Sequence, residues 1–228
     1  MNIVINDVRV SFESGAGPLT VLDIPSWQVD KGEQVVISGP SGTGKSTLLN
    51  VLAGMLLPSS GSVRVCDKEI SSMPEAQRDN FRALHIGYVF QSFNLLQGYT
   101  ALENVLVGMT FSPVRPDRKT AYSLLKELGL EKRAGHYPAH LSIGEQQRVA
   151  IARVLAKKPD LILADEPTGS LDPRHREEVI TALVRSASGQ GCSLIVVSHE
   201  ERVAAHFEKQ VDFLRLNRAF SEEGGEGA

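Results

Sequence analysis

The stretch EQVVISGPSGTGKSTLLNVLAG, residues 33–54, joins a β-branched run to an apolar helical pattern through a glycine-rich loop. Within it, GPSGTGKS matches G-x-x-x-x-G-K-[ST], and a strand before and a helix after are the context in which that pattern binds phosphate. Backbone N–H groups of such a loop turn inward around phosphates, the lysine offsets their charge and the hydroxyl can hold Mg²⁺. We therefore predict that the loop binds the phosphates of a nucleotide through Gly39, Pro40, Ser41, Gly42, Thr43, Gly44, Lys45, Ser46 and Thr47.

Strand and helix patterns alternate along most of the chain, and several strands, such as LILAD and SLIVV, are almost wholly apolar. This combination predicts an α/β fold with a mostly parallel sheet covered on both faces, as in P-loop NTPases of the RecA-like type. Alternating patterns near residues 2–12 and 19–29 predict a separate N-terminal antiparallel β subdomain, in which Pro25 favours an edge or a bulge. Residues from about 92 to 158 read as an inserted α-helical subdomain. We expect one domain over residues 1–220 and a disordered acidic tail over 221–228.

The composition is that of a soluble globular protein, with 42% hydrophobic and 22% charged residues among 228. A net charge of -3 gives no support for a nucleic-acid partner. Cys66 and Cys192 lie far apart and are expected to be reduced thiols. The N-terminus lacks the pattern of a secretion signal, and no apolar run reaches the ~18 residues that a membrane helix needs. We therefore expect a cytoplasmic protein that works at a membrane only through other chains.

Acidic and polar residues stand at the ends of the apolar strands. Asp165 and Glu166 follow the buried run LILA, at the edge of the sheet where α/β proteins bind ligands. Asp165 can hold Mg²⁺, and Glu166 can orient or deprotonate a water that attacks the γ-phosphate. Gln91 and His199 end two other strands, so both are expected near the γ-phosphate, Gln91 also at the metal and His199 holding the water. With Lys45 these residues favour hydrolysis over transfer to an acceptor, although a kinase remains an alternative.

A second anion-binding corner opens the segment LSIGEQQRVAIAR, residues 141–153. A Ser-x-Gly turn at the start of a helix offers a hydroxyl, free N–H groups and the positive end of the helix dipole. Ser142 is also a suitable N-cap, and the corner has no lysine of its own. Phe12, after the first strand, could stack under an adenine ring or be an ordinary core residue.

These segments, taken in order, resemble the ATP-binding subunits of ABC transporters: GPSGTGKST, Gln91, LSIGEQQRVAIAR, LADEPTGSLD and VSH. The resemblance covers nearly the whole chain. It implies that two copies pack head to tail, with ATP between the phosphate loop of one copy and Ser142, Gly144 and Glu145 of the other. Lys45 of the opposite chain then supplies the charge that the second corner lacks. Asp172, in the segment SLD, would lie in the link between the two ATP sites.

The second corner departs from the usual family sequence LSGGQ, because this chain has Ile143 and Glu145. A carboxylate exposed to the phosphates would weaken their binding, so reduced but real ATPase activity is expected. On this hypothesis Glu145→Gln raises the rate.

The segment FQSFNLLQGYTALENV, residues 90–105, resembles the lipoprotein-release and macrolide-export ATPases and the related cell-division ATPase, although Gln97 stands where many members have proline. The resemblance implies that a short cytoplasmic helix of a permease docks here, with Phe93, Leu95, Leu96 and Tyr99 as candidate contacts. Local packing is the alternative for these four residues. The expected protein is an ATPase that drives a separate integral membrane permease from the inner face of the cell membrane. An ATP-switched regulator of a cell-division-type complex is the main alternative.

Overall fold

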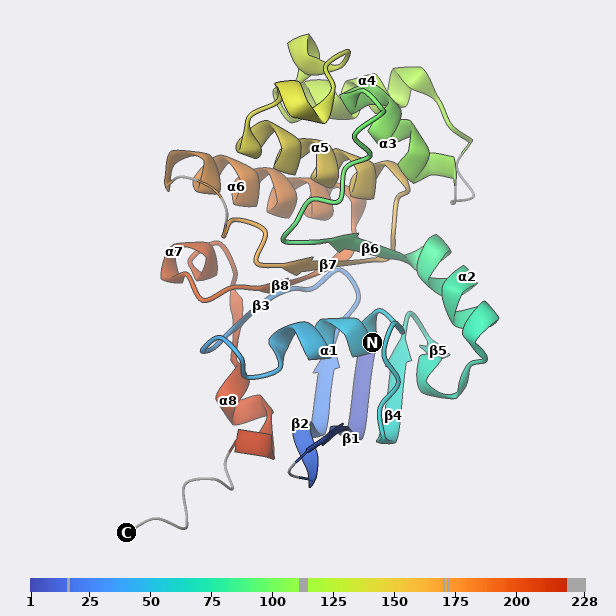
Figure 1. Ribbon diagram of the computed structural model, residues 1–228, viewed down its shortest axis with the longest axis vertical. Coiled ribbons are helices and arrows are strands. Elements are labelled where there is room, and N and C mark those ends of the chain that lie inside the picture. Colours follow the sequence, from blue (N-terminus) through green and yellow to red (C-terminus); the bar gives the residue numbers. More distant parts are fainter. Residues whose placement is uncertain (16, 111–114, 170, 172, 221–228) are drawn as a thin grey trace.

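Two β-sheets of different character make up the strands of the protein (Figure 1). The structure is a computed structural model that describes residues 1–15, 17–110, 115–169, 171 and 173–220, so the predicted tail at 221–228 lies outside the described residues. One sheet has five strands, all paired in parallel in the order β6-β7-β8-β3-β9. Its strands are β3 (Gln34–Ser38), β6 (Ile86–Val89), β7 (Leu161–Asp165), β8 (Ser193–Val197) and β9 (Lys209–Asp212).

The other sheet is antiparallel and has the order β2-β1-β4-β5. Its strands are β1 (Ile3–Ser14), β2 (Gly17–Val29), β4 (Ser60–Val65) and β5 (Lys68–Glu69). Pro25 lies in β2, at the edge of this sheet, where a residue without an N–H removes no ladder hydrogen bond on the open side. The predicted α/β fold with a separate antiparallel sheet is thus confirmed.

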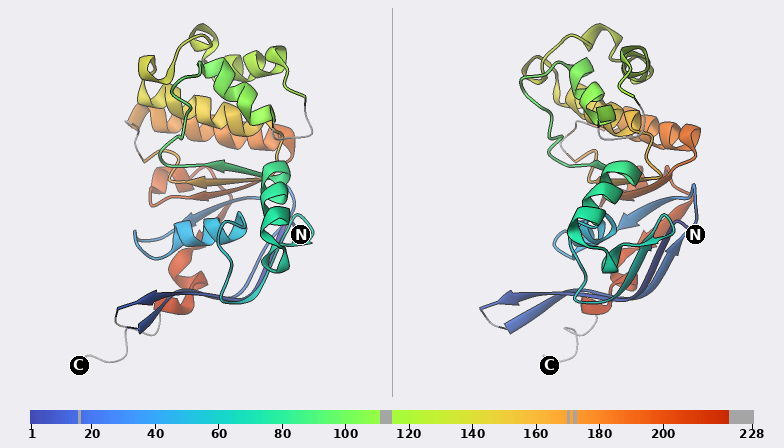
Figure 2. Two further views of the ribbon diagram at one scale, coloured as in Figure 1. Left: turned by 45° about the vertical axis from the view of Figure 1, so that its right-hand side comes forward. Right: turned by 90° about the vertical axis from the view of Figure 1, so that its right-hand side faces the viewer.

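Helices lie on both sides of the parallel sheet, as Figures 1 and 2 show. The α-helices are α1 (Lys45–Leu52), α2 (Glu75–His85), α3 (Ala101–Thr110), α4 (Arg118–Glu127), α5 (Ile143–Ala156), α6 (Pro173–Gln190), α7 (Glu201–Ala204) and α8 (Phe213–Leu216). Short 3₁₀ turns cover Ile70–Ser72, Glu131–Arg133, Pro138–His140 and Arg218–Phe220. Within the part of the chain that the structure describes, no helix has the length and apolar character needed to cross a membrane.

Strand β7 shows why its sequence is almost wholly apolar. Ile162 and Ala164 pack into a core that they share with α3, α5 and α6, whereas Leu161 and Leu163 pack into a second core with α1 and the antiparallel sheet. Successive side chains of a strand point to opposite faces, so a strand covered on both faces needs apolar residues throughout. The sheet therefore separates α1 from α5, and the two predicted anion-binding corners belong to different layers.

Some element ends differ from the sequence-based prediction. Strand β6 ends at Val89 and β8 at Val197, so Gln91 and His199 each lie two residues beyond a strand rather than at its last position. Strand β9 was not predicted: its sequence KQVD is short and has a single apolar residue, and the pairing with β3 holds it in the sheet. The helices α3, α4 and α5 all lie between β6 and β7. Cys66 and Cys192 are both free, as expected.

Candidate functional site

The glycine-rich loop connects β3 to α1 and takes a conformation that side chains rarely allow. Gly42 and Gly44 have φ values of 79° and 97°. A Cβ on Gly44 would lie 2.9 Å from Val21 Cγ1 and 3.0 Å from the Val21 carbonyl oxygen, so glycine is also required by the contact with β2. The loop and the first residues of α1 line a hollow of about 420 Å³, and the first N–H groups of a helix have no partner within the helix.

Lys45 is buried at the first position of α1 and folds back over the loop. Its Nζ donates to the carbonyl oxygens of Gly39 at 2.9 Å and of Pro40 at 2.6 Å, and Thr43 Oγ1 donates to the Pro40 oxygen at 2.8 Å. Burial lowers the pKa of the Lys45 ammonium, and the nearby carboxylates counter this effect in part. The lysine thus holds the loop closed and places a positive charge at the hollow.

Asp165 ends β7 beside the start of α1. Burial raises the pKa of its carboxyl, while a hydrogen bond from Ser46 and the charge of Lys45 lower it. Together with the Gln91 amide, the hydroxyl of Ser46 and the carboxylate of Asp165 form a set of oxygen donors, which is the type that Mg²⁺ prefers. No group of three or more His, Cys, Asp and Glu is placed to hold a metal among the described residues. A donor set this small fits a Mg²⁺ ion that shares its coordination with substrate phosphates and water.

Glu166 follows directly and has a left-handed backbone, with φ of 45°. Its N–H donates to the Val197 carbonyl at 3.0 Å, which fixes the residue against the end of β8. One carboxylate oxygen, Oε1, lies 2.8 Å from His199 Nδ1. The other, Oε2, is buried and has no hydrogen-bond partner among the described residues. A buried acceptor of this kind is costly unless a donor such as a water occupies the site in use.

The structure brings most of the predicted residues of the first corner together around this hollow. The predicted residues that line it are Ser41, Gly42, Gly44, Lys45, Ser46, Thr47, Gln91, Asp165, Glu166 and His199. Gly39, Pro40 and Thr43 belong to the loop but do not line the hollow.

Sequence reasoning missed three further lining residues: Val21, Gly169 and Val197. Gly169 could have been predicted, because it follows Glu166 closely in the chain. A Cβ on this glycine would lie 3.8 Å from Gln91 Nε2. Val21 had none, because only the fold brings β2 to the loop.

The second corner does not contribute to the hollow, since Ser142, Gly144 and Glu145 are absent from its lining. Ser142 is the N-cap of α5 and forms a capping box with Glu145: Glu145 N–H donates to Ser142 Oγ at 3.2 Å, and Ser142 N–H to Glu145 Oε2 at 2.8 Å. Arg133 Nε donates to the other oxygen, Oε1, at 2.7 Å. Both oxygens of Glu145 therefore have partners, which argues against the bare carboxylate that the sequence suggested. Ile143, between these residues, is 53% exposed.

Two other predicted site residues lie away from the hollow or outside the described structure. Phe12, near the end of β1, is 43% exposed, so the core alternative for this residue was wrong; stacking on a base stays a prediction. Asp172 lies outside the described residues. Pro173 begins α6 directly after it, as predicted.

The four candidate permease contacts differ in exposure. Leu95 is buried in the core of the helical layer and Phe93 packs against that core, as the packing alternative requires. Leu96 and Tyr99 are 41% and 46% exposed. The buried Asn104 holds the loop that carries them, accepting from Leu96 N–H and donating to three carbonyl oxygens of residues 96–100.

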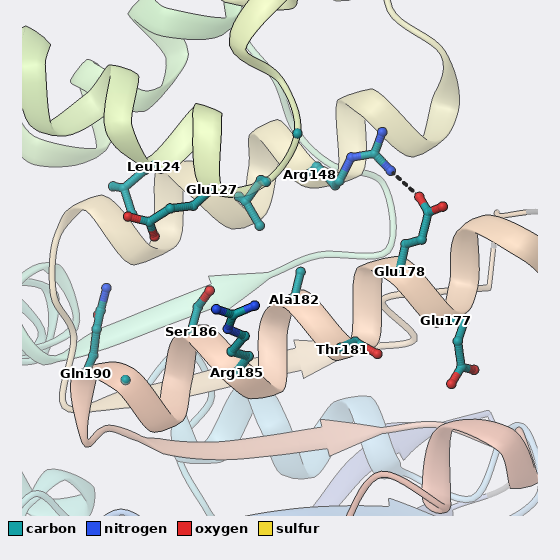
Figure 3. A pocket seen from close by; sticks show the side chains of 13 residues that line it. Leu124, Glu127, Arg148, Glu177, Glu178, Thr181, Ala182, Arg185, Ser186 and Gln190 are labelled. Atoms are coloured by element: carbon teal, nitrogen blue, oxygen red, sulfur yellow. Dashed lines mark hydrogen bonds and ion pairs between the residues drawn. The ribbon is translucent and has the colours of Figure 1, made fainter.

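A wider groove of about 890 Å³ lies elsewhere, between α4, α5 and α6 (Figure 3). Its walls combine the apolar Leu124 and Ala182 with charged side chains, among which Arg148 Nη1 lies 3.3 Å from Glu178 Oε2. Its lining includes none of the predicted phosphate-binding residues. The residues predicted to bind phosphate therefore gather at the smaller hollow and not at this groove.

The family model for ABC transporters matches residues 22–169, which hold the phosphate loop, the capped helix α5 and the carboxylates at the end of β7. The chain belongs to the ABC transporter family. Curated relatives agree with this assignment. The macrolide export ATP-binding/permease protein MacB of Burkholderia thailandensis is 43% identical over 203 residues, which cover 88% of this chain but only 31% of that protein.

Two other ABC relatives are similar to this chain over most of their own length. The lipoprotein-releasing system ATP-binding protein LolD of Chromohalobacter salexigens is 40% identical, with 87% of this chain and 84% of the relative covered. The ABC transporter ATP-binding protein YtrE of Bacillus subtilis is 40% identical, with 81% of each chain covered.

Solved structures of ABC cassettes are similar over nearly the whole fold. The dimeric post-hydrolysis state of the ATP-binding cassette MJ0796, bound to ADP and Pi, has a TM-score of 0.85 and 35% identity, and 95% of each chain is covered. A second dimeric structure of MJ0796 has a TM-score of 0.83 and 37% identity. The prediction of an ABC-type cassette, resembling LolD and MacB and built to bind and hydrolyse ATP, is thereby confirmed.

Proposed function

We propose that this ABC cassette is the ATPase subunit of a lipoprotein-release or macrolide-export type of transporter. Two copies close head to tail around two ATP molecules and drive a separate membrane permease. The observation that carries this proposal is the pair Glu166–His199 beside Lys45, with Glu166 Oε2 buried and unpartnered among the described residues. An acceptor held in this way suits a water molecule that attacks the γ-phosphate.

Each residue at the hollow has a role in this hydrolysis. The loop N–H groups and Lys45 bind the β- and γ-phosphates, and Ser46, Asp165 and Gln91 would hold Mg²⁺, which supplies positive charge to the phosphate oxygens. Glu166 accepts a proton from the attacking water or orients it. His199 Nδ1 lies 2.8 Å from Glu166 Oε1 and keeps that carboxylate in place, which leaves its other ring nitrogen for the γ-phosphate.

The dimer follows from the division of the site between two layers. Ser142 and Gly144 cap α5 on the far side of the parallel sheet from α1, so they cannot reach the phosphate loop of their own chain through the sheet. A second copy packed head to tail would present its α5 N-terminus to this loop, with Phe12 under the adenine. The relative MJ0796 is dimeric in its solved structures, which supports this arrangement.

The permease is the third part of the proposal. The relative MacB is an ATP-binding/permease protein of which this chain spans about a third, and LolD is the ATP-binding protein of a lipoprotein-releasing system. We place the chain in the cytoplasm, on the inner face of the membrane, with exposed Leu96 and Tyr99 as its permease contacts. The comparisons lend no support to a cell-division switch or a kinase.

The substitution Glu166→Gln tests this function, because it removes the base and keeps the shape of the side chain. We expect it to bind MgATP, lose turnover by roughly 10²–10⁴-fold and elute as a dimer in gel filtration with ATP. The matched control, Glu166→Gln combined with Ser142→Arg, places a bulky residue in the second corner and should elute as a monomer. A single variant that stays monomeric at saturating ATP would refute the shared site.

A further inference from the structure

A closed ring of hydrogen bonds lies behind the Glu166–His199 pair and is not part of the nucleotide hollow. It joins Thr168 and Leu171, which follow Glu166, to Glu200, which follows His199, and to Arg176 on α6. Figure 1 shows α7, which begins just after Glu200, beside the first turns of α6. The ring therefore sits where the two chain segments that carry the reactive pair approach α6.

Every link in the ring is a direct contact. Arg176 Nη1 donates to Glu200 Oε2 at 2.6 Å, and Thr168 Oγ1 donates to Glu200 Oε1 at 3.2 Å. Arg176 Nε donates to the Leu171 carbonyl at 2.7 Å, and Leu171 N–H donates back to the Thr168 carbonyl at 3.0 Å. The guanidinium thus contacts two chain segments at once through two different nitrogens.

The ring is shielded on its acidic side and open to water at its guanidinium. Thr168 is fully buried and the Glu200 side chain is 12% exposed, whereas the Arg176 side chain is 35% exposed. Both oxygens of Glu200 have a donor, so the carboxylate is satisfied only while Arg176 and Thr168 keep their places. Removal of one partner from a shielded ion pair leaves the other charge uncompensated, which makes such an arrangement sensitive to small displacements.

The ring contacts both chain segments that carry the reactive pair, the one with His199 and the one with Glu166. On one side, Glu200 is the neighbour of His199, whose ring contacts Glu166. On the other side, Thr168 and Leu171 follow Glu166 in the chain. Neither Arg176 nor Glu200 lines the nucleotide hollow. Arg176 and the Thr168–Glu200 hydrogen bond therefore connect the two sides of the ring away from the nucleotide hollow.

We propose that Arg176 and Glu200 are positioning residues. The ring ties Thr168 and Leu171, which follow Glu166, to Glu200, which follows His199, and so keeps the His199–Glu166 pair in place for water attack. This inference rests on the proposed roles of Glu166 and His199.

The test compares Arg176→Ala and Glu200→Gln with the parent chain in steady-state ATPase assays. We expect each variant to lower kcat at least tenfold while KM for ATP and the affinity for a fluorescent ATP analogue change less than twofold. The double variant should lower kcat no further than the worse single variant, since both break one ring. Arg176→Lys should recover only part of the rate, because one amine cannot reproduce the two-sided guanidinium contact.

Arg202→Ala is the matched control. Arg202 lies beside the same small hollow as Arg176 and Glu200, and it has no ion pair among the described residues. It should leave kcat unchanged. Thermal unfolding of all variants shows whether a lower kcat comes from a misplaced His199–Glu166 pair or from loss of the fold. If Arg176→Ala does not fold, the isosteric variant Glu200→Gln provides the test.

Two results would overturn the inference: a folded Glu200→Gln with kcat within twofold of the parent, or an increase in KM at unchanged kcat. The parent rate and its loss in Glu166→Gln report separately on the proposed function. If the parent has Glu166-dependent ATPase activity, the function stands whatever the ring variants show. A parent without ATPase activity would overturn the function and the inference together.

Discussion

Glu145 stands where the usual family sequence LSGGQ has glutamine. Substitution of this residue tests whether its carboxylate weakens ATP hydrolysis or serves only in the capping box of α5. The structure gives this carboxylate two partners, the Ser142 N–H at 2.8 Å and Arg133 Nε at 2.7 Å, and leaves its side chain 17% exposed. The negative charge is therefore compensated within the protomer. For that reason we expect Glu145→Gln to change the ATPase rate less than threefold, in contrast to the strong increase that the sequence alone suggested.

The same contacts set the expected effect on stability. Gln keeps an oxygen that can accept from Ser142 N–H and loses the ion pair with Arg133, which for a half-exposed partner is worth ~0.2–1 kcal/mol. Ala loses the capping box as well, which brings the expected loss in the free energy of unfolding to about 1–2 kcal/mol. Urea denaturation of the two variants measures the difference.

The variant Arg133→Ala tests directly whether Arg133 neutralises the charge of Glu145. It removes the cationic partner of Glu145 and leaves only the Ser142 N–H on this carboxylate, at the N-terminus of α5, where a charge is worth up to ~1 kcal/mol, or about fivefold in rate. We expect the phosphate-release rate to fall by about this factor and to recover in the double variant Arg133→Ala/Glu145→Gln. The reasoning fails if Glu145→Gln alone speeds turnover more than tenfold, or if the double variant is as slow as Arg133→Ala.

Three further substitutions test the phosphate loop, its support by Asn217 and the burial of Lys157. Lys45→Ala should weaken nucleotide binding, measured by fluorescence titration, because it removes both the charge at the hollow and the contacts that close the loop. Asn217→Ala should lower the free energy of unfolding by about 2–3 kcal/mol in urea, because the fully buried amide donates to the carbonyls of Val21 at 2.9 Å and Thr43 at 3.3 Å; an unchanged denaturation midpoint would contradict this. Burial lowers the pKa of Lys157 from 10.5 to about 8, so the folded state carries a penalty that is complete below pH 8 and is relieved as the pH rises toward 10.5. Across that window the free energy of unfolding of the parent should therefore rise by about 1–2 kcal/mol relative to that of Lys157→Met, after allowance for partial exposure of the side chain. If the free energies of unfolding of the two proteins change with pH in the same way, the burial argument is refuted.

Much of the nucleotide hollow was predictable because its residues obey local rules. The phosphate loop is a continuous stretch, and Asp165, Glu166, Gln91 and His199 stand at or just after strands whose carboxyl ends meet at one edge of a parallel sheet. The N-cap role of Ser142 is local too, since its partner Glu145 is three residues away. Patterns of this kind depend on chain direction and side-chain periodicity alone.

Other features depend on residues that are far apart in the sequence. Asn217 holds the loop at Thr43 across 174 residues, and Arg176 reaches Glu200 across 24. Strand β9 exists because β3 offers it an open edge, although its own sequence has no strong strand pattern. No local pattern indicates such contacts, because the two residues come together only when the helices and strands pack.

The sequence by itself determined most of the strands and helices of the parallel sheet, the phosphate loop and the carboxylates beside it, because hydrophobic periodicity and glycine conformations act over a few residues. Only the tertiary structure decided that Glu145 is neutralised by Arg133, that Leu95 is buried while Leu96 and Tyr99 are exposed, and that Arg176 joins the segments behind Glu166 and His199. The reason is that charge compensation and burial depend on which surfaces meet when the layers pack, and that choice involves the whole chain at once.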